Sequence, residues 1–321
     1  MLLKKIFSVF SLLAGFASYA QDTTESAILR NLDAEARLQM NVKQPVLVFH
    51  SQKLINAKTV EVLKKGILDF NVTHNFGDIA GDNGGIKNFF GLDNAADVKI
   101  GFQLGLTDRL NILFARTRGS GAIIRFYELG IKNQFMQQGR NNQPLSVTGF
   151  ANVVVCSQTA NPNPGFEGSF GNFSDRMSQL AQIMIARKMG KVSLQISPTY
   201  LHTNYVISGD QKNIFSLGGA IRLPLSQSVS IISDYFHPFR SAASKNAVEA
   251  AQNIKLSDAF GIGVEILTPG HVFHLNFTNA TNILENRYLS RTFTSWRDGE
   301  FRWGFTIVRN FVVFTDKRKR K

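Results

Sequence analysis

The stretch that decides the fold is ADVKIGFQLGL, residues 96–106. Val98, Ile100 and Phe102 occupy alternate positions, and polar or small residues stand between them. A period of two is typical of a β-strand with an apolar environment on one face and a polar environment on the other. The stretch is also long enough to cross a bilayer as a tilted strand, which takes about 9–11 residues.

The same alternation recurs along most of the chain after Gly66. We predict twelve strands, and in 145–156 and 177–189 the pattern leaves the two faces unassigned. The predicted strands are 66–76, 96–106, 109–118, 123–137, 145–156, 177–189, 192–200, 215–223, 227–238, 259–267, 272–278 and 301–311. Tight turns and mostly long loops alternate between them, which is typical of an outer-membrane barrel.

Two soluble all-β folds compete with this interpretation. Strands of a secreted β-sandwich are usually about 5–6 residues long, whereas many of these reach 10 or more. A lipocalin-like barrel has only about eight strands. We therefore expect an all-β fold, a transmembrane antiparallel up-and-down β-barrel over residues 65–315, with a short helical or extended segment before it.

The N-terminus indicates export. Lys4 and Lys5 precede an apolar run, and Ser18-Tyr19-Ala20 has the small residues of a signal-peptidase site, so we expect a signal peptide over 1–20, cleaved after Ala20. Residues 21–64 are predicted to form a periplasmic or plug-like segment, with a helix over Glu25–Met40 and a strand-like run at Val46–Ser51. Residues 316–321 form a basic tail. We expect the protein in the cell outer membrane.

Composition narrows the function. The single Cys156 excludes a disulfide scaffold and a CxxC metal or redox site. The formal net charge is +13, but an exported protein rarely meets nucleic acid, so we expect no nucleic-acid partner. The expected partners are outer-membrane lipid, the barrel-assembly machinery and small polar solutes.

The polar face of the predicted strands contains charged residues that would be costly against lipid, about 2–4 kcal/mol for each cation near the midplane. We therefore predict that these residues line the lumen, where both signs of charge would pass or hold small polar solutes with weak ion selectivity. The candidate lumen-lining residues are Asp69, Asp97, Lys99, Glu128, Lys132, Arg222, Glu265, His274 and Arg302.

The favoured function is a non-enzymatic pore, uptake component or structural barrel, and two alternatives remain open. The first is an outer-membrane hydrolase of lipid or peptide, with a Ser nucleophile and a base at His74, His202 or His237. The second is a scaffold for exported partner proteins. No GxSxG motif occurs, and loop 78–97 is rich in oxygen ligands but lacks the EF-hand spacing. We assign no catalytic residue, metal or cofactor.

Several segments resemble a barrel family of unknown function from the outer membranes of Bacteroidota. The matching segments are GILDFN from Gly66, HNFGD from His74, NFFGLDN from Asn88, IARK from Ile185, GHVFHLNFTN from Gly270 and WRDGE from Trp296. This resemblance implies an outer-membrane barrel and no defined activity.

Overall fold

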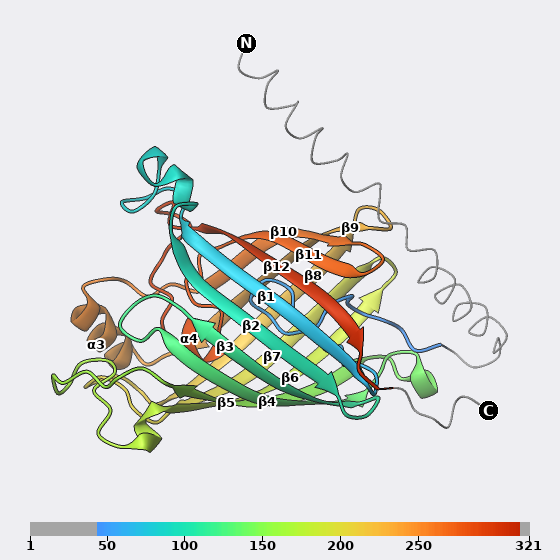
Figure 1. Cartoon of the computed structure of the whole chain (residues 1–321), viewed down its shortest axis with the longest axis horizontal. Helices are drawn as coiled ribbons and strands as arrows, with labels where there is room; N and C mark the ends of the chain where they lie inside the picture. Colours follow the sequence, from blue (N-terminus) through green and yellow to red (C-terminus); the bar gives the residue numbers. More distant parts are fainter. Residues whose placement is uncertain (1–43, 315–321) are drawn as a thin grey trace, which may run out of the picture. The chain divides into compact units, whose positions relative to one another are not determined.

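Twelve antiparallel strands, each hydrogen-bonded to its neighbour in the sequence, form the wall of a closed barrel (Figure 1). The computed structural model describes residues 44–314; the predicted signal peptide, the helix over Glu25–Met40 and the basic tail lie outside them. The strands are β1 (Ile67–Asp78), β2 (Ala95–Gly105), β3 (Leu110–Arg118), β4 (Arg125–Met136), β5 (Ser146–Cys156), β6 (Met177–Met189), β7 (Val192–Thr203), β8 (Asn213–Pro224), β9 (Val229–Phe239), β10 (Ala259–Leu267), β11 (His271–Thr278) and β12 (Arg302–Val312). Pairing of β1 with β12 closes the barrel.

The predicted strand count and order are confirmed, and the bounds shift by a few residues. The connection between the strands predicted at 227–238 and 259–267 contains a helix that we did not predict, α3 (Ala242–Gln252). Ser241 caps this helix by accepting a hydrogen bond from the Ser244 amide, and Asn253 ends it in the left-handed conformation. Both are ordinary helix-end signals that alternation alone does not detect.

The connections at the two ends of the barrel differ in length. Residues 106–109, 137–145, 190–191, 225–228 and 268–270 form short turns at one end. At the other end lie mostly longer loops, residues 79–94, 157–176, 204–212, 240–258 and 279–301, together with the short connection 119–124. These loops carry η2 (Ile86–Gly91), η4 (Phe173–Arg176), α3 and α4 (Glu285–Tyr288), and Figure 1 shows α3 and α4 together at that end.

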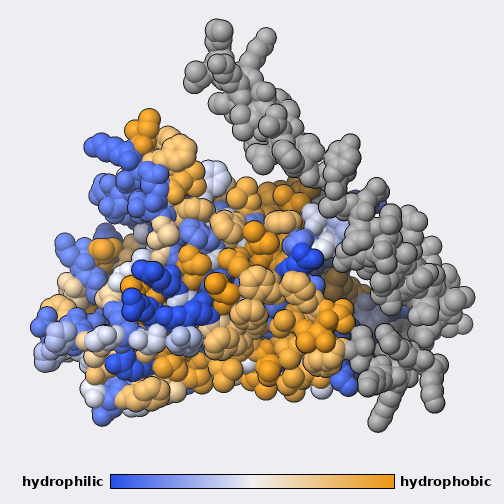
Figure 2. All heavy atoms as spheres, in the orientation of Figure 1, coloured by the Kyte–Doolittle hydropathy of each residue, from blue (hydrophilic) through white to orange (hydrophobic). Residues whose placement is uncertain are grey.

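Large apolar side chains point outward from the wall. The exposed fractions of Leu129 and Phe215 are 65% and 62%. Figure 2 shows a broad hydrophobic band over the barrel side. Such a band suits acyl chains, because apolar surface of this extent in water is unfavourable. No helix within residues 44–314 has the length and apolarity that a membrane span requires.

Two segments that belong to none of the twelve strands lie inside the barrel. The first, residues 44–66, we call the plug. It enters and leaves at the short-turn end, where the Val46 amide donates to Gln138 O and the Gly66 amide donates to Gly105 O. The strand-like run Val46–Ser51 does not join the barrel sheet; an isolated bridge between Lys53 and Lys58 folds the plug back on itself. The second segment, residues 279–294, enters from the long-loop end, and we call it the inner loop.

Candidate functional site: the lumen and its plug

All nine charged or histidine side chains predicted to line the lumen are buried within the barrel. Their exposed fractions lie between 0% for Glu265 and 5% for Lys99. Burial of this kind requires a partner for each charge, because an unpaired charge in a low-dielectric interior is strongly unfavourable.

One group of these residues meets the plug at Lys58. The Lys58 Nζ atom lies 2.7 Å from Glu285 Oε1 of the inner loop and 3.4 Å from Glu128 Oε1 of β4. Glu128 also binds Lys99 of β2 at 2.5 Å and accepts a hydrogen bond from Asn152 of β5 at 2.7 Å. Two cations and two anions thus join the wall, the plug and the inner loop.

A second group brings together Arg222, Glu265 and His274 of β8, β10 and β11. Arg222 Nε donates to Glu265 Oε1 at 2.6 Å, and His274 Nε2 lies 3.2 Å from Glu265 Oε2. The other ring nitrogen of His274 lies 3.1 Å from the carbonyl oxygen of Leu54 in the plug. This group therefore also contacts the plug.

The other four predicted residues lie apart. Lys132 donates to Gln52 of the plug at 3.1 Å, and Asp97 accepts the Ile283 amide of the inner loop at 2.7 Å. Asp69 accepts from Asn71 within β1, while Arg302 pairs with Asp78 across the β1–β12 seam at 2.5 Å. The nine residues therefore form no single site.

Asp234 of β9, which sequence reasoning missed, holds the tip of the plug. Its Oδ2 atom accepts hydrogen bonds from the successive backbone amides of Ile55, Asn56 and Ala57 at 2.7–3.1 Å, and Asn56 Nδ2 donates to Oδ1 at 2.9 Å. Hydrogen bonds to an ionised carboxylate are stronger than those between neutral groups. Asp234 shares the parity of the polar Ser230 on β9, and that parity was the available sequence signal.

Further wall side chains bind the plug backbone. Gln195 Oε1 accepts the Val60 amide while its Nε2 donates to Lys58 O, and Asn111 contacts both polar backbone atoms of Leu63. Thr148 donates to Val60 O, and Ser193 donates to Val48 O. Because these residues come from β3, β5 and β7 as well as β9 and β11, the plug is surrounded by the wall.

One side of the plug packs on apolar groups that also point inward. Val48, Phe49, Leu54 and Val60 of the plug are fully buried in a cluster with wall residues. The wall members include Phe150, Leu180, Met184, Leu201, Ile214, Ile232 and Phe236. In the strands predicted at 145–156 and 177–189, whose two faces the sequence pattern left unassigned, Phe150, Leu180 and Met184 therefore point inward.

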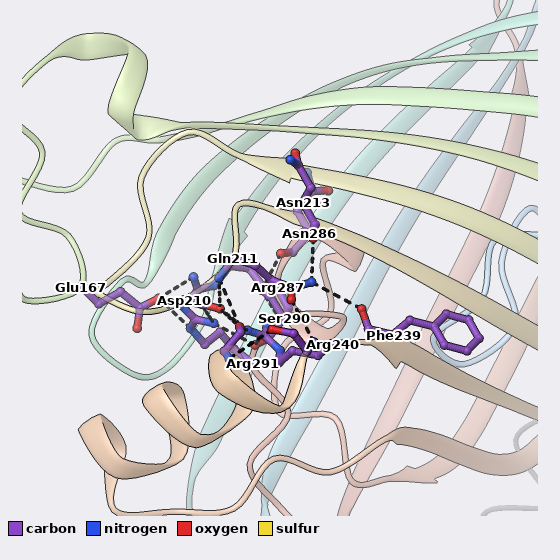
Figure 3. Close-up of polar contacts among 12 residues, drawn as sticks. Glu167, Asp210, Gln211, Asn213, Phe239, Arg240, Asn286, Arg287, Ser290 and Arg291 are labelled. Atoms are coloured by element: carbon purple, nitrogen blue, oxygen red, sulfur yellow. Dashed lines mark hydrogen bonds and ion pairs between the residues drawn. The ribbon is translucent and has the colours of Figure 1, made fainter.

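A buried ion-pair network, which we call the loop clasp, joins four of the long loops (Figure 3). It consists of Glu167, Asp210, Arg240, Arg287 and Arg291. Arg287 Nη1 lies 2.7 Å from Glu167 Oε1, Arg291 Nη1 lies 3.0 Å from Asp210 Oδ2, and Arg240 also binds Asp210. Burial tends to raise the pKa of Glu167, but the Arg287 and Arg291 guanidinium groups hold that pKa below its usual range.

The three histidines considered for hydrolysis all lie on the outward face of their strands. His202 Nδ1 lies 2.6 Å from Asn213 Oδ1, and His74 stacks on Phe305. His237 alone of the three is oriented by a carboxylate, with Nδ1 2.8 Å from Asp258 Oδ2. It lines a rim pocket of about 520 Å³ together with Ser241 and Ser257.

The wall and its contents define a membrane-spanning β-barrel with an occupied lumen. The chain belongs to the family described as membrane bound beta barrel domain (DUF5777), which matches residues 49–311. No curated protein sequence shows significant similarity to the chain.

Solved porins are similar in arrangement at low identity. The NanC porin in a rhombohedral crystal form is 8% identical and covers 76% of this chain and 98% of its own, with a TM-score of 0.45. The KdgM porin in complex with disordered oligogalacturonate is 6% identical and covers 76% and 99%, also with a TM-score of 0.45. Salmonella typhi OmpF in complex with daunomycin is 8% identical and covers 76% and 97%, with a TM-score of 0.36.

Proposed function

We propose that the protein is an outer-membrane barrel for the passage of small polar solutes and that the plug and the inner loop hold it closed in this conformation. In the proposed orientation in the membrane, the long loops face the cell exterior and the short turns face the periplasm, as is usual for outer-membrane barrels. The lumen opens when the plug moves within the wall.

The observation that carries this proposal is the polar attachment of the plug to the wall. The plug backbone is bound by side chains such as Asp234, Gln195 and Asn111. Each hydrogen bond between neutral groups contributes only about 0.5–1.5 kcal/mol net, and each bond to the Asp234 carboxylate about 1.5–3 kcal/mol, because water can replace either partner. A segment bound in this way can be displaced as water or a polar solute enters.

The charge of the wall bears on selectivity. The inward face carries both signs of charge, from Asp69, Asp97, Glu128, Asp234 and Glu265 on one side and Lys99, Lys132, Arg222 and Arg302 on the other. With the plug displaced, a lumen with both signs of charge has no strong preference for cations or anions. We therefore expect weak ion selectivity, as measured by the reversal potential in a salt gradient.

Liposome swelling with a pentose sugar tests solute passage. We expect little swelling with residues 21–321 and rapid swelling with residues 65–321, which lack all but the last two residues of the plug. A heat-dependent shift in gel mobility confirms that each barrel is folded, and Lys58→Met serves as a second opening variant if the shortened chain fails to fold. Folded barrels that never admit the sugar, with or without the plug, would refute the proposal.

The His237–Asp258 pair favours a second candidate, ester hydrolysis at the outer rim. Its geometry resembles that of an oriented base, because the carboxylate binds Nδ1 and leaves Nε2 free to accept a proton. Hydrolysis of a fatty-acyl ester by the purified barrel, lost in His237→Ala but retained in His202→Ala, would support it. Equal hydrolysis by both variants would dismiss it.

A further inference from the structure

The outward faces of β3 and β4 change from apolar to cationic over four successive cross-strand pairs. Starting from the centre of the wall, the pairs are Ile112 with Ile131, Phe114 with Leu129, Arg116 with Tyr127, and Arg118 with Arg125. The last pair lies next to the 119–124 loop, at the long-loop end. We call Arg116, Arg118 and Arg125 the arginine cluster.

The arginine cluster has unbalanced charge. Arg118 and Arg125 are both exposed and stand directly opposite each other, where Cβ atoms are about 5 Å apart and like charges are destabilising. No ion pair found in the described part of the chain includes any of the three guanidinium groups.

Arg116 is held in place beside that pair. Its Nη1 atom donates to Phe126 O at 3.1 Å and to Ser157 Oγ at 3.0 Å. Its guanidinium lies over the Tyr127 ring, 4.3 Å from the centroid. These contacts fix one cation of the cluster while leaving its charge unneutralised.

An apolar groove begins directly below the arginine cluster on the same wall. It has a volume of about 320 Å³ and is lined by Ile112, Leu129, Ile131, Ala151 and Val153, with Gly130 and Asn152. In Figure 2 a strongly hydrophilic patch lies on the barrel side, bordered by the hydrophobic band.

We propose that the arginine cluster binds the phosphate of an anionic lipid of the outer leaflet and that the groove holds one of its acyl chains. Guanidinium groups bind phosphate through paired N–H donors, and an anion between Arg118 and Arg125 would relieve their repulsion. Since the long-loop end faces outward in the proposed orientation, this inference rests on that part of the proposed function.

The spacing along the strand suits a lipid. Ile112 and Arg118 are six residues apart, about 20 Å along an antiparallel strand. At the roughly 45° tilt of a membrane strand this distance becomes about 14 Å along the bilayer normal, about half the thickness of the hydrocarbon core. With the arginine cluster at the headgroup level, the groove lies where the acyl chains run. An acidic protein segment would leave the groove without an apolar occupant.

Native mass spectrometry of residues 21–321 in a neutral detergent, titrated with phosphatidic acid, tests the site. We expect phosphatidic acid to bind at least tenfold more tightly than diacylglycerol with the same chains and than inorganic phosphate. The triple variant R116Q/R118Q/R125Q should lose this preference. Arg187→Gln, which removes an exposed outward cation from β6, should retain it.

The heat-dependent gel shift verifies folding, and Arg118→Gln alone, with an expected weakening of at least threefold, replaces the triple variant if that variant does not fold. Unchanged binding by the folded variant would overturn the proposal. Equal binding of diacylglycerol would show that the phosphate is not recognised, and equal binding of inorganic phosphate would show that no lipid is required. A dimer that dissociates in the triple variant would assign the arginine cluster to contact between copies instead. Loss of lipid binding in the triple variant of residues 21–321, with pentose passage intact when the same three changes are made in residues 65–321, would separate this proposal from the pore function.

Discussion

The Lys58 ammonium lies 2.7 Å from Glu285 Oε1, and this contact joins the plug to the inner loop inside the barrel. Both side chains are almost fully buried, at 7% and 2% exposure. A buried ion pair is weak evidence for stability, because its desolvation offsets much of its attraction, but removal of one partner is strongly destabilising. The pair therefore holds the plug and the inner loop in fixed positions relative to each other.

Lys58→Met should weaken the closed state. The change leaves Glu128 and Glu285 with less compensating charge in a buried setting, and we expect a loss of about 3–5 kcal/mol in the free energy of unfolding. Urea unfolding in lipid vesicles measures it. Lys245→Met removes an exposed partner of Glu249 on α3 and should cost less than about 0.5 kcal/mol. Similar losses in the two variants would contradict the assigned role of Lys58.

Asp234→Asn should loosen the tip of the plug. The amide retains one acceptor oxygen but loses the negative charge that binds three backbone amides, at a cost of about 1.5–3 kcal/mol. Hydrogen exchange should accelerate at least tenfold at Ile55, Asn56 and Ala57. In Asp258→Asn, altered outside the lumen, these amides should exchange at the wild-type rate. Unchanged protection in Asp234→Asn would show that the carboxylate does not hold the plug.

Gly105→Ala should disturb the place where the plug leaves the barrel. A Cβ atom at Gly105 would lie 2.1 Å from the carbonyl oxygen of Lys64, so backbone must shift, and overpacking of this kind costs about 1–3 kcal/mol. Gly219→Ala on β8 is the matched control, because its added Cβ meets no atom within 4 Å. The midpoint of thermal unfolding should be lower for Gly105→Ala than for Gly219→Ala. Equal midpoints would contradict the close approach of the plug to Gly105.

The loop clasp should weaken in acid. Because the pKa of Glu167 is lowered in the folded state, its contribution to stability is complete above its ordinary pKa and is lost as the pH falls through the folded value. The hydrogen-exchange protection factors in loop 157–176, which correct for the slower intrinsic exchange of amides at lower pH, should therefore fall on acidification. Glu167→Gln should exchange faster at neutral pH and respond less to acid, and a full acid response in that variant would exclude Glu167 as the cause.

The wall could be predicted from sequence because lipid and lumen impose different chemistry on alternate residues. In β2, Ile100 and Phe102 point outward while Asp97 and Lys99 are buried inward. Charges such as Glu265 and Arg222 were recognisable for the same reason, since the cost of placing them against lipid is large.

The contacts within the lumen could not be predicted in the same way. Phe49 and Leu54 of the plug pack in a cluster that includes the inward apolar residues Phe150 of β5 and Met184 of β6. Both faces of β5 and β6 are therefore apolar at these positions. Alternation then weakens in 145–156 and 177–189. The pairing of Lys58 with Glu285 depends on two inserted segments that meet only in the folded barrel. No local sequence pattern predicts such a contact.

Single-channel conductance in planar bilayers tests the central claim, that a movable plug closes a solute pathway. Residues 21–321 should show rare, brief current steps, and residues 65–321 should show long openings with little preference between cation and anion. Folded barrels of both lengths that pass no current would contradict the account, and so would equal, continuous conductance by both.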